Sequence, residues 1–217
     1  MTKITPLISK QEFEKKYVSE PYERIAQHFK VTRIYSWPKV EEYIQSLDKG
    51  TTIYDIGCGN GRNLNLRDDC SFIGCDNCLE LLNEALKKNP NCVYGDNLLL
   101  PFENNCAQAV LSIAVIHHFS TNERRLQALR ELFRILKPGG TILIYVWSHE
   151  QERFKNTSQD ALVNWNEQTT GVIYQRYYYL FKKNELDLLI SNNFQNINIK
   201  ESGEQCHNYY IIAQKIH

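Results

Sequence analysis

Residues 51–61 read TTIYDIGCGNG, and this stretch decides the fold of the chain. The β-branched and apolar run over residues 51–56 predicts a buried strand, and glycines at positions 57, 59 and 61 end it in a sharp turn. Glycines let the backbone approach a ligand closely and turn directly into a helix. The spacing is GxGxG, which differs from the GxGxxG pattern that binds a pyrophosphate. We therefore expect a ligand other than a dinucleotide at the carboxyl end of this strand.

Outside this stretch, strand and helix patterns alternate along the chain. Further strands are expected over residues 71–75, 92–94, 107–115 and 141–147, with a closing antiparallel pair over 194–200 and 209–215. Helices are expected over residues 9–30, with a break or restart at Pro21, and over 38–47, 79–88, 120–136 and 182–191. Residues 148–175 are polar and are expected to form a long loop or insertion. Alternation of this kind predicts an α/β fold, with a parallel sheet covered by helices on both faces.

Composition limits the class of protein. The 217 residues carry 25 basic and 25 acidic side chains and are 42% hydrophobic, which indicates a folded core and argues against nucleic-acid binding by bulk charge. No apolar run approaches the roughly 18 residues that cross a bilayer, and no signal peptide or membrane partner is expected. The seven cysteines are odd in number and irregularly spaced, which favours the cytoplasm and leaves the nucleus open.

Cys75 and Cys78 form a lone CxxC pair. A zinc site needs a second pair, or histidines at ligand spacing, and neither follows at a convincing distance. We therefore expect no metal site and interpret both residues as buried thiols.

Three acidic residues mark the ends of three successive strands. Asp55 precedes the glycine turn, Asp76 lies 19 residues after Gly57, and Asp96 ends the third strand. An acid at the position of Asp76 can bind both hydroxyls of a ribose, while Asp55 would repel a pyrophosphate but suits a cation. S-adenosylmethionine fits this pattern, with its amino-acid end at Asp55, its ribose at Asp76 and its adenine amino group at Asp96. The alternative is a glycine turn whose acids serve only the structure.

Several further motifs together resemble one family. They are HFKVTR over residues 28–33, Trp37-Pro38, SIAVIHHFST over 112–121, ERR over 123–125, IYVW over 144–147, QDALVNW over 159–165, and QRYY over 175–178. With the glycine turn, they resemble the eukaryotic tRNA wobble-uridine carboxymethyl methyltransferases, which are class I methyltransferases. The resemblance covers about residues 17–215. Lys30 departs from the family pattern, in which a serine is expected.

The resemblance implies both a fold and an activity. The fold is a Rossmann-like sheet of seven mostly parallel strands, with a terminal antiparallel strand and helices on both faces. The activity is methyl transfer from S-adenosylmethionine to the carboxylate of 5-carboxymethyluridine at wobble position 34, giving 5-methoxycarbonylmethyluridine and S-adenosylhomocysteine. Residues 1–50 are expected to be a helical extension that packs on the core and active site, and residues 51–217 the methyltransferase domain. The oxygenase and RNA-recognition modules of the animal relatives are not expected in a chain of 217 residues.

The expected site has a cofactor half and an acceptor half. The expected cofactor-binding residues are Asp55, Gly57, Gly59, Gly61, Asp76, Asp96, Asn97 and Ala114. A carboxylate acceptor is ionised at neutral pH, so it needs positioning groups rather than a general base. We expect Arg33, His117 and Arg124 to be the catalytic residues, with Arg33 forming a bidentate pair. One of the histidines, His118, is expected to be structural, and the alternative for Arg33 is a surface salt bridge.

Two partners are implied. The first is the tRNA anticodon loop, for which the expected phosphate contacts are Lys15, Lys16, Lys30, Arg33, Lys39, Arg153, Lys155, Arg176, Lys182 and Lys183, with Tyr177, Tyr178 and Tyr179 as candidates for base stacking. The second is a small zinc-binding methyltransferase activator. Residues 92–94 form an apolar sheet edge without proline or lysine, and such an edge invites a partner.

Two other functions remain open on the sequence alone. A small-molecule methyltransferase would share the cofactor site and differ in the acceptor region. A non-catalytic scaffold that binds the cofactor and stabilises a partner would not need the set of Arg33 and His117 beside the three acids.

Overall fold

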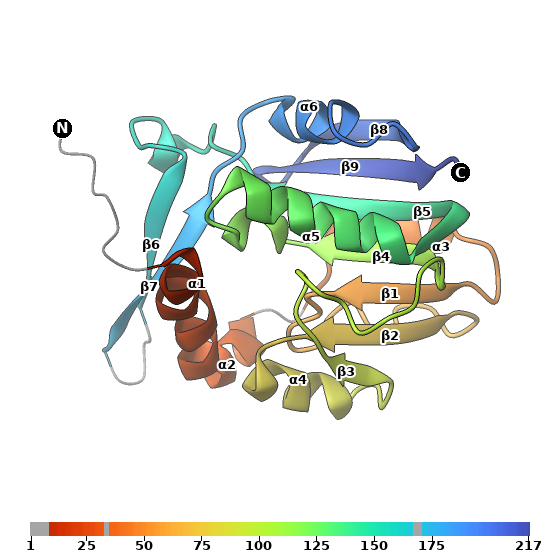
Figure 1. Ribbon diagram of the computed structural model, residues 1–217. Helices are drawn as coiled ribbons and strands as arrows, with labels where there is room; N and C mark the ends of the chain where they lie inside the picture. The colour runs from red at the N-terminus through yellow and green to blue at the C-terminus, as the bar shows by residue number, and fades with distance from the viewer. Residues whose placement is uncertain (1–8, 33–34, 167–170) are drawn as a thin grey trace.

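The computed structural model of the protein describes residues 9–32, 35–166 and 171–217 (Figure 1). Arg33, one of the expected catalytic residues, lies outside these residues. No helix in the described part of the chain is both long enough and apolar enough to cross a membrane.

A seven-stranded sheet forms the centre of the molecule. Its strands lie in the order β3 (Cys92–Tyr94), β2 (Ser71–Asp76), β1 (Thr52–Ile56), β4 (Ala107–Ile113), β5 (Leu136–Trp147), β9 (Asn208–Lys215) and β8 (Ile197–Gln205). Strands β1 to β5 are parallel, and β9 pairs antiparallel with both β5 and β8. The expected mostly parallel sheet with a terminal antiparallel strand is confirmed.

Alternate residues of the strands pack against helices on opposite faces of the sheet. On one face, Ile142 and Ile144 of β5 join a core with α5 (Asn122–Ile135) and α6 (Glu185–Ser191). On the other face, Leu143 and Tyr145 pack with α3 (Pro38–Ser46) and α4 (Leu79–Leu86). A parallel sheet that is buried on both faces needs such continuous apolar strands, because successive side chains point to opposite sides.

The N-terminal helix does not end at Pro21 but restarts there as an α-helix after a π-helical turn, which is one of the two expected outcomes. Helix α1 (Lys10–Glu14) runs into a π-helical turn, η1 (Lys15–Ser19), and then into α2 (Glu20–Thr32). A proline lacks the N–H for the helical ladder, and its ring crowds the preceding turn. The wider π turn, in which the N–H of Glu20 donates to the carbonyl of Lys15, accommodates it.

Residues 148–175 are not a long loop. They contain a short 3-10 turn, η3 (Glu152–Phe154), strand β6 (Asp160–Asn166) and the start of strand β7 (Ile173–Tyr179). Strands β6 and β7 pair as an antiparallel two-stranded sheet, separate from the main one. This hairpin and helices α1 and α2 lie together beyond the carboxyl ends of the parallel strands, on the left of Figure 1. They form a wall over the edge of the sheet where ligands of α/β folds bind.

Candidate active site

A cavity of about 1130 Å³ lies at the carboxyl ends of the parallel strands. Its floor is formed by the segments that follow β1, β2, β3 and β4, and its walls by helix α1, the π turn, and strand β7. The cavity therefore brings together residues from the whole length of the described chain.

The glycine turn after β1 has the geometry that only glycine allows. Gly57 has a φ of +80°, and a Cβ at this position would lie 2.2 Å from Cγ2 of Val115. The N–H of Gly59 donates to Oδ2 of Asp76 at 2.8 Å. Gly57 and Gly59, two of the expected cofactor-binding residues, line the cavity.

Gly61 has another role than the expected cofactor contact. It is not among the residues that line the cavity. A Cβ here would lie 3.0 Å from Cα of Ala85 in helix α4, so the missing side chain lets the turn pack tightly on that helix. The third glycine of the motif serves packing rather than ligand binding.

Asp76 is held rigidly at the edge of the cavity. Its Oδ1 accepts the N–H of Cys78 and its Oδ2 that of Gly59, both at 2.8 Å. Burial raises the pKa of Asp76, although these backbone hydrogen bonds oppose the shift. The carboxylate lines the cavity and still has lone pairs that can accept the hydroxyl groups of a ligand.

Asp55 lies fully buried behind the glycine turn rather than in the cavity wall. Its Oδ2 accepts a hydrogen bond from Nδ2 of Asn63 at 3.3 Å, and its Oδ1 has no partner among the described residues. Burial raises the pKa of Asp55 to about 7, and the Asn63 hydrogen bond opposes this only in part. A cation bound at the turn would stabilise the ionised form.

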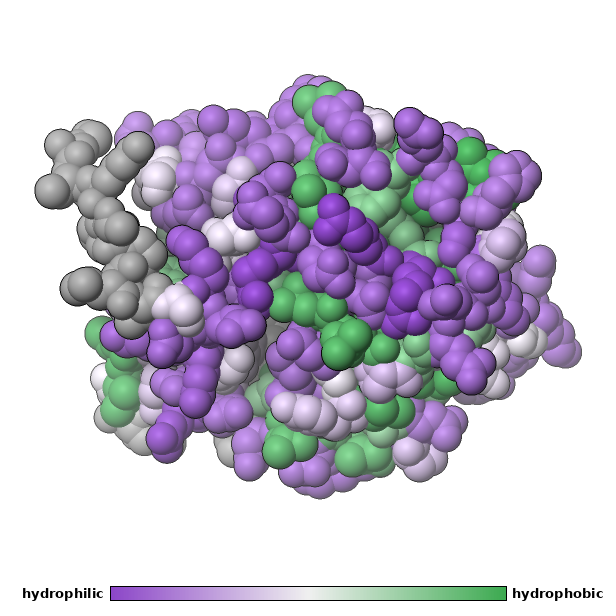
Figure 2. Space-filling model, in the orientation of Figure 1, coloured by the Kyte–Doolittle hydropathy of each residue, from purple (hydrophilic) through white to green (hydrophobic). Residues whose placement is uncertain are grey.

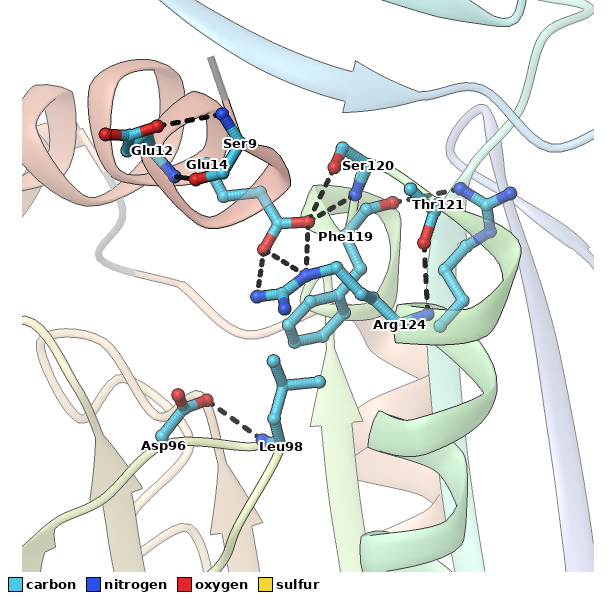
Figure 3. A network of polar contacts seen from close by, with 10 residues as sticks. Ser9, Glu12, Glu14, Asp96, Leu98, Phe119, Ser120, Thr121 and Arg124 are labelled. Atoms are coloured by element: carbon cyan, nitrogen blue, oxygen red, sulfur yellow. Dashed lines mark hydrogen bonds and ion pairs between the residues drawn. The ribbon is translucent and has the colours of Figure 1, made fainter.

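Two residues after β3 line the cavity and differ in how far their polar atoms are hydrogen-bonded within the protein. Oδ1 of Asp96 accepts the N–H of Leu98 at 2.9 Å (Figure 3). Asn97 is buried, and neither its Nδ2 nor its Oδ1 has a partner within the described chain. Ala114 also lines the cavity, with a φ of +64°. An amide with a free donor and a free acceptor matches the edge of a ligand that offers both, as adenine does.

The two adjacent histidines differ in what they can offer a ligand. Nδ1 of His118 lies 2.9 Å from the carbonyl of Tyr177, and its Nε2 lies 3.0 Å from the hydroxyl of Tyr22. Nδ1 of His117 accepts the N–H of Trp147 at 3.0 Å, so the ring proton lies on Nε2. This Nε2 has no partner in the residues that the structure describes. His118 is therefore satisfied by the protein, as expected for one of the pair.

Both histidines are neutral. Burial lowers the pKa of His118 to about 3, and burial with the nearby His118 and Arg176 lowers that of His117 well below its usual range. His117 lines the cavity; in its neutral form the buried Nε2–H is a hydrogen-bond donor without a partner in the described residues, and the ring cannot serve as a cation.

Arg124 lines the cavity but is already paired with a carboxylate (Figure 3). Its Nε and Nη2 donate to Glu14 of helix α1 at 2.7–2.9 Å. The backbone N–H and the hydroxyl of Ser120 donate to the same carboxylate at 2.6 and 2.8 Å. A substrate carboxylate would have to displace Glu14 to reach Arg124, so the structure favours a role in holding α1 for this expected catalytic residue.

Several residues expected to contact RNA instead make contacts within the protein. The ammonium of Lys39 is buried between Glu42 and Glu201 at 2.7 Å from each, which corrects its assignment to a phosphate-binding edge. The hydroxyl of Tyr177 bonds Asp160, and the ring is buried. Tyr178 stacks on Trp147, with ring centroids 4.0 Å apart, and forms an inner wall of the cavity.

Arg176 of strand β7, for which the sequence predicted only a phosphate contact, also lines the cavity. Its side chain is buried, and its Cζ lies 4.5 Å from the ring centre of Trp165 and 5.2 Å from that of Tyr178. Residues 173–179 read IYQRYYY, without a regular alternation of polar and apolar residues, so no local pattern marked Arg176. Once the strand is known, residues 174, 176 and 178 lie on one face of it.

Cys75 and Cys78 are buried thiols. Burial raises the pKa of Cys75 to about 12 and that of Cys78 to about 11, so both stay protonated. Within residues 9–32, 35–166 and 171–217, the structure has no cluster of three or more side chains of the kinds that bind metal ions.

Comparison of the sequence with known proteins identifies relatives. The Methyltransferase domain family matches residues 54–144. A tRNA (carboxymethyluridine(34)-5-O)-methyltransferase of Schizosaccharomyces pombe is 37% identical, and the match covers 94% of this chain and 98% of the relative. A tRNA (carboxymethyluridine(34)-5-O)-methyltransferase of Xenopus tropicalis is 33% identical over 94% of this chain, which spans only 41% of that longer protein.

Solved structures share the fold at low sequence identity. A Haloferax volcanii methyltransferase in complex with the Trm112 methyltransferase activator has a TM-score of 0.69 at 17% identity, covering 92% of this chain and 98% of that one. The 1,6-didemethyltoxoflavin-N1-methyltransferase of Burkholderia thailandensis, with bound S-adenosylhomocysteine, has a TM-score of 0.72 at 16% identity, covering 98% and 93%.

Proposed function

Because the chain belongs to the tRNA (carboxymethyluridine(34)-5-O)-methyltransferase family, we propose that it methylates the carboxylate of 5-carboxymethyluridine at position 34 of tRNA. S-adenosylmethionine is the methyl donor, and the product nucleoside is 5-methoxycarbonylmethyluridine. The observation that carries the proposal is the division of one cavity into two halves. One half, beside the glycine turn after β1, has acids at the ends of β2 and β3, and the other, beyond β4, has hydrogen-bond donors and an arginine.

The acidic half fits S-adenosylmethionine. The glycine turn lets the backbone approach the amino-acid end, and the buried Asp55 behind it favours a positive charge there. Asp76 lies 19 residues after Gly57, where a carboxylate can accept both ribose hydroxyls. The unpartnered amide of Asn97 can pair with the adenine edge. When bound, the cofactor supplies an electrophilic methyl group on a sulfonium.

The other half fits a carboxylate that needs positioning only. A carboxylate with an ordinary pKa near 4 is ionised at neutral pH, so the protein does not have to remove a proton from it. His117 lines this half of the cavity and has a buried, unpartnered Nε2–H. A neutral donor orients the carboxylate without neutralising its charge. Holding the two reactants in line is the largest contribution that a methyl-transfer enzyme makes to the reaction rate.

A small activator protein is proposed to bind the edge of the sheet at β3. Val93 and Tyr94 of this strand are 37% and 58% exposed, and Leu99, which follows it, is 78% exposed. Figure 2 shows hydrophobic surface along the lower edge, where β3 and α4 lie in Figure 1. An apolar edge strand of this kind is the surface to which a partner adds a strand. The Haloferax volcanii structure of the same fold, solved with its activator, supports this proposal.

The proposed compartment is the cytoplasm or the nucleus. The seven free cysteines of the chain, most of them wholly or partly buried, suit a reducing environment.

A methyl-transfer assay with matched acceptors tests the proposed activity. The protein, with a candidate activator added, is incubated with labelled S-adenosylmethionine and tRNA that carries 5-carboxymethyluridine at position 34. We expect label in that tRNA, and none in the same tRNA with uridine at position 34. Labelling of the free nucleoside or of small carboxylic acids, without labelling of the tRNA, would favour a small-molecule methyltransferase. S-adenosylmethionine binding without any transfer would favour a scaffold.

A further inference from the structure

Arg176 is a buried cation without an anionic partner. Its side chain is only 4% exposed, and no carboxylate of the described residues forms an ion pair with it. Its Nε also has no hydrogen-bond partner in that part of the chain. Burying an unpaired charge is costly, so such groups are normally paired or wait for a ligand.

The surroundings of Arg176 fix its position without neutralising it. Its Nη1 donates to the hydroxyl of Tyr22 at 3.2 Å. The same hydroxyl lies 3.0 Å from Nε2 of His118, whose Nδ1 lies 2.9 Å from the carbonyl of Tyr177. The carbonyl needs a donor, so each group in this chain donates to the next: Arg176, Tyr22, His118 and the backbone. The ring of Trp165, 4.5 Å from Cζ, adds a cation–π contact.

Arg176 and His117 are neighbours across a single ring. Cζ of Arg176 lies 5.2 Å from the ring centre of Tyr178, and the His117 ring lies 5.1 Å from it. The charge of Arg176 is one of the causes that lower the pKa of His117. The lining of one cavity thus contains an unpaired guanidinium and an unpartnered neutral N–H, each about one ring-contact distance from Tyr178.

We propose that Arg176, together with Nε2–H of His117, binds the carboxylate that accepts the methyl group. This assignment rests on the proposed function. A carboxylate at the end of the carboxymethyl arm can reach a group buried in the wall, whereas a backbone phosphate cannot leave the surface of the RNA loop. The exposed Arg153, over the rings of Trp147 and Phe154, is placed at the rim and suits a phosphate instead.

Three tRNAs that differ only at position 34 test this proposal. They carry 5-carboxymethyluridine, its uncharged amide 5-carbamoylmethyluridine, or uridine, and their binding is measured in saturating S-adenosylhomocysteine. Because hydrogen bonds to a charged group are stronger than those to a neutral one, we expect the wild type to bind the carboxylate tRNA about tenfold or more tightly than the amide tRNA. In Arg176→Gln we expect this ratio to fall to about one, while the affinity for the uridine tRNA changes less than about threefold.

Other variants separate the proposal from simpler explanations. Arg153→Gln is expected to lower the affinity for all three tRNAs alike and to reduce the salt dependence of binding. Arg130→Gln, on the exposed surface of α5, is expected to leave the affinity for all three tRNAs unchanged. If Arg176→Gln does not fold, Arg176→Lys keeps the buried charge but loses the two-pronged geometry, and its carboxylate preference is expected to fall in the same direction.

The outcomes are distinguishable. Three results would each overturn the assignment of Arg176. They are a carboxylate preference preserved in both Arg176 variants, an equal loss of affinity for all three tRNAs, and a loss of S-adenosylhomocysteine binding. A wild-type protein that neither prefers nor methylates the carboxylate tRNA would instead overturn the proposed function itself.

Discussion

The carboxylate of Glu14, in helix α1, accepts hydrogen bonds from Nε and Nη2 of Arg124, in helix α5, across 110 residues of sequence. Ser120, just before α5, donates to the same carboxylate twice. This cluster joins the N-terminal helix to the wall of the cavity, and both Glu14 and Arg124 line it (Figure 3).

Replacing Glu14 should loosen helix α1 from the rest of the protein. Glu14→Gln loses the ion pair, and hydrogen bonds to charged groups contribute about 1.5–3 kcal/mol to stability. We expect the free energy of unfolding to fall by about this amount in denaturant titrations, and limited proteolysis to cut sooner at Lys15 and Lys16. Glu12→Gln is the control, because Glu12 caps its own helix through Ser9 and, in the described part of the chain, forms no hydrogen bond or ion pair with α5. Equal effects of the two substitutions would contradict the account.

Gly57 and Gly50 form a matched pair for testing the glycine turn. Both have a φ of +80°, but a Cβ at Gly57 would lie 2.2 Å from Val115, whereas nothing lies within 4 Å at Gly50. Each alanine variant should lose about 1–2 kcal/mol of stability from backbone strain. Only Gly57→Ala should also weaken S-adenosylmethionine binding, by at least about tenfold if the turn must reshape. Unchanged affinity by calorimetry would mean that the turn does not shape the cofactor site.

Asp55 should make the stability of the cofactor-free protein depend on pH. Burial raises the pKa of Asp55 in the folded state from its ordinary value of 3.8 to about 7. The stability associated with protonated Asp55 is therefore full below about pH 4 and is lost as the pH rises through about 7. Relative to Asp55→Asn, the wild type should lose unfolding free energy over this range, on the order of 4 kcal/mol at most. Parallel stability curves for the two proteins between pH 5 and pH 8 would show that Asp55 titrates normally.

The edge strand β3 should be the surface that binds the activator. Val93→Lys places a charge on the exposed apolar edge, and lysine is the residue by which sheet edges avoid unwanted pairing. We expect the variant to lose co-purification with the activator while keeping its own melting temperature within a few degrees. Leu188→Lys, at an exposed apolar position of α6 away from this edge, is the control and should still bind. Retained binding by the Val93 variant would place the activator elsewhere.

The sheet and the cofactor half of the site could be predicted from local patterns. Apolar runs, glycine positions and acids at strand ends are all properties of short stretches, and the fold brings the strand ends together without further information. The strand at residues 92–94 and the cavity-lining Gly57, Asp76 and Asn97 follow from these patterns.

The acceptor half could not be predicted in the same way. The β6–β7 hairpin has polar residues on both sides and packs against helices 130 residues or more away in the sequence, such as the Trp165 to His28 contact. Arg124 was expected to face a substrate because its partner, Glu14, is encoded far from it. In the cofactor half, Gly61 looked like a ligand-binding glycine because its packing on Ala85 depends on the tertiary structure. Each error concerns a long-range contact.

The most direct test of the proposed activity is mass spectrometry of wobble nucleosides from cells that lack this protein. We expect 5-methoxycarbonylmethyluridine to disappear from position 34 and its unmethylated carboxylate to accumulate. The wild-type chain should restore the ester, and a chain with Asp76→Ala, which loses the proposed ribose contact, should not. Unchanged levels of the methyl ester in the cells that lack the protein would contradict the account.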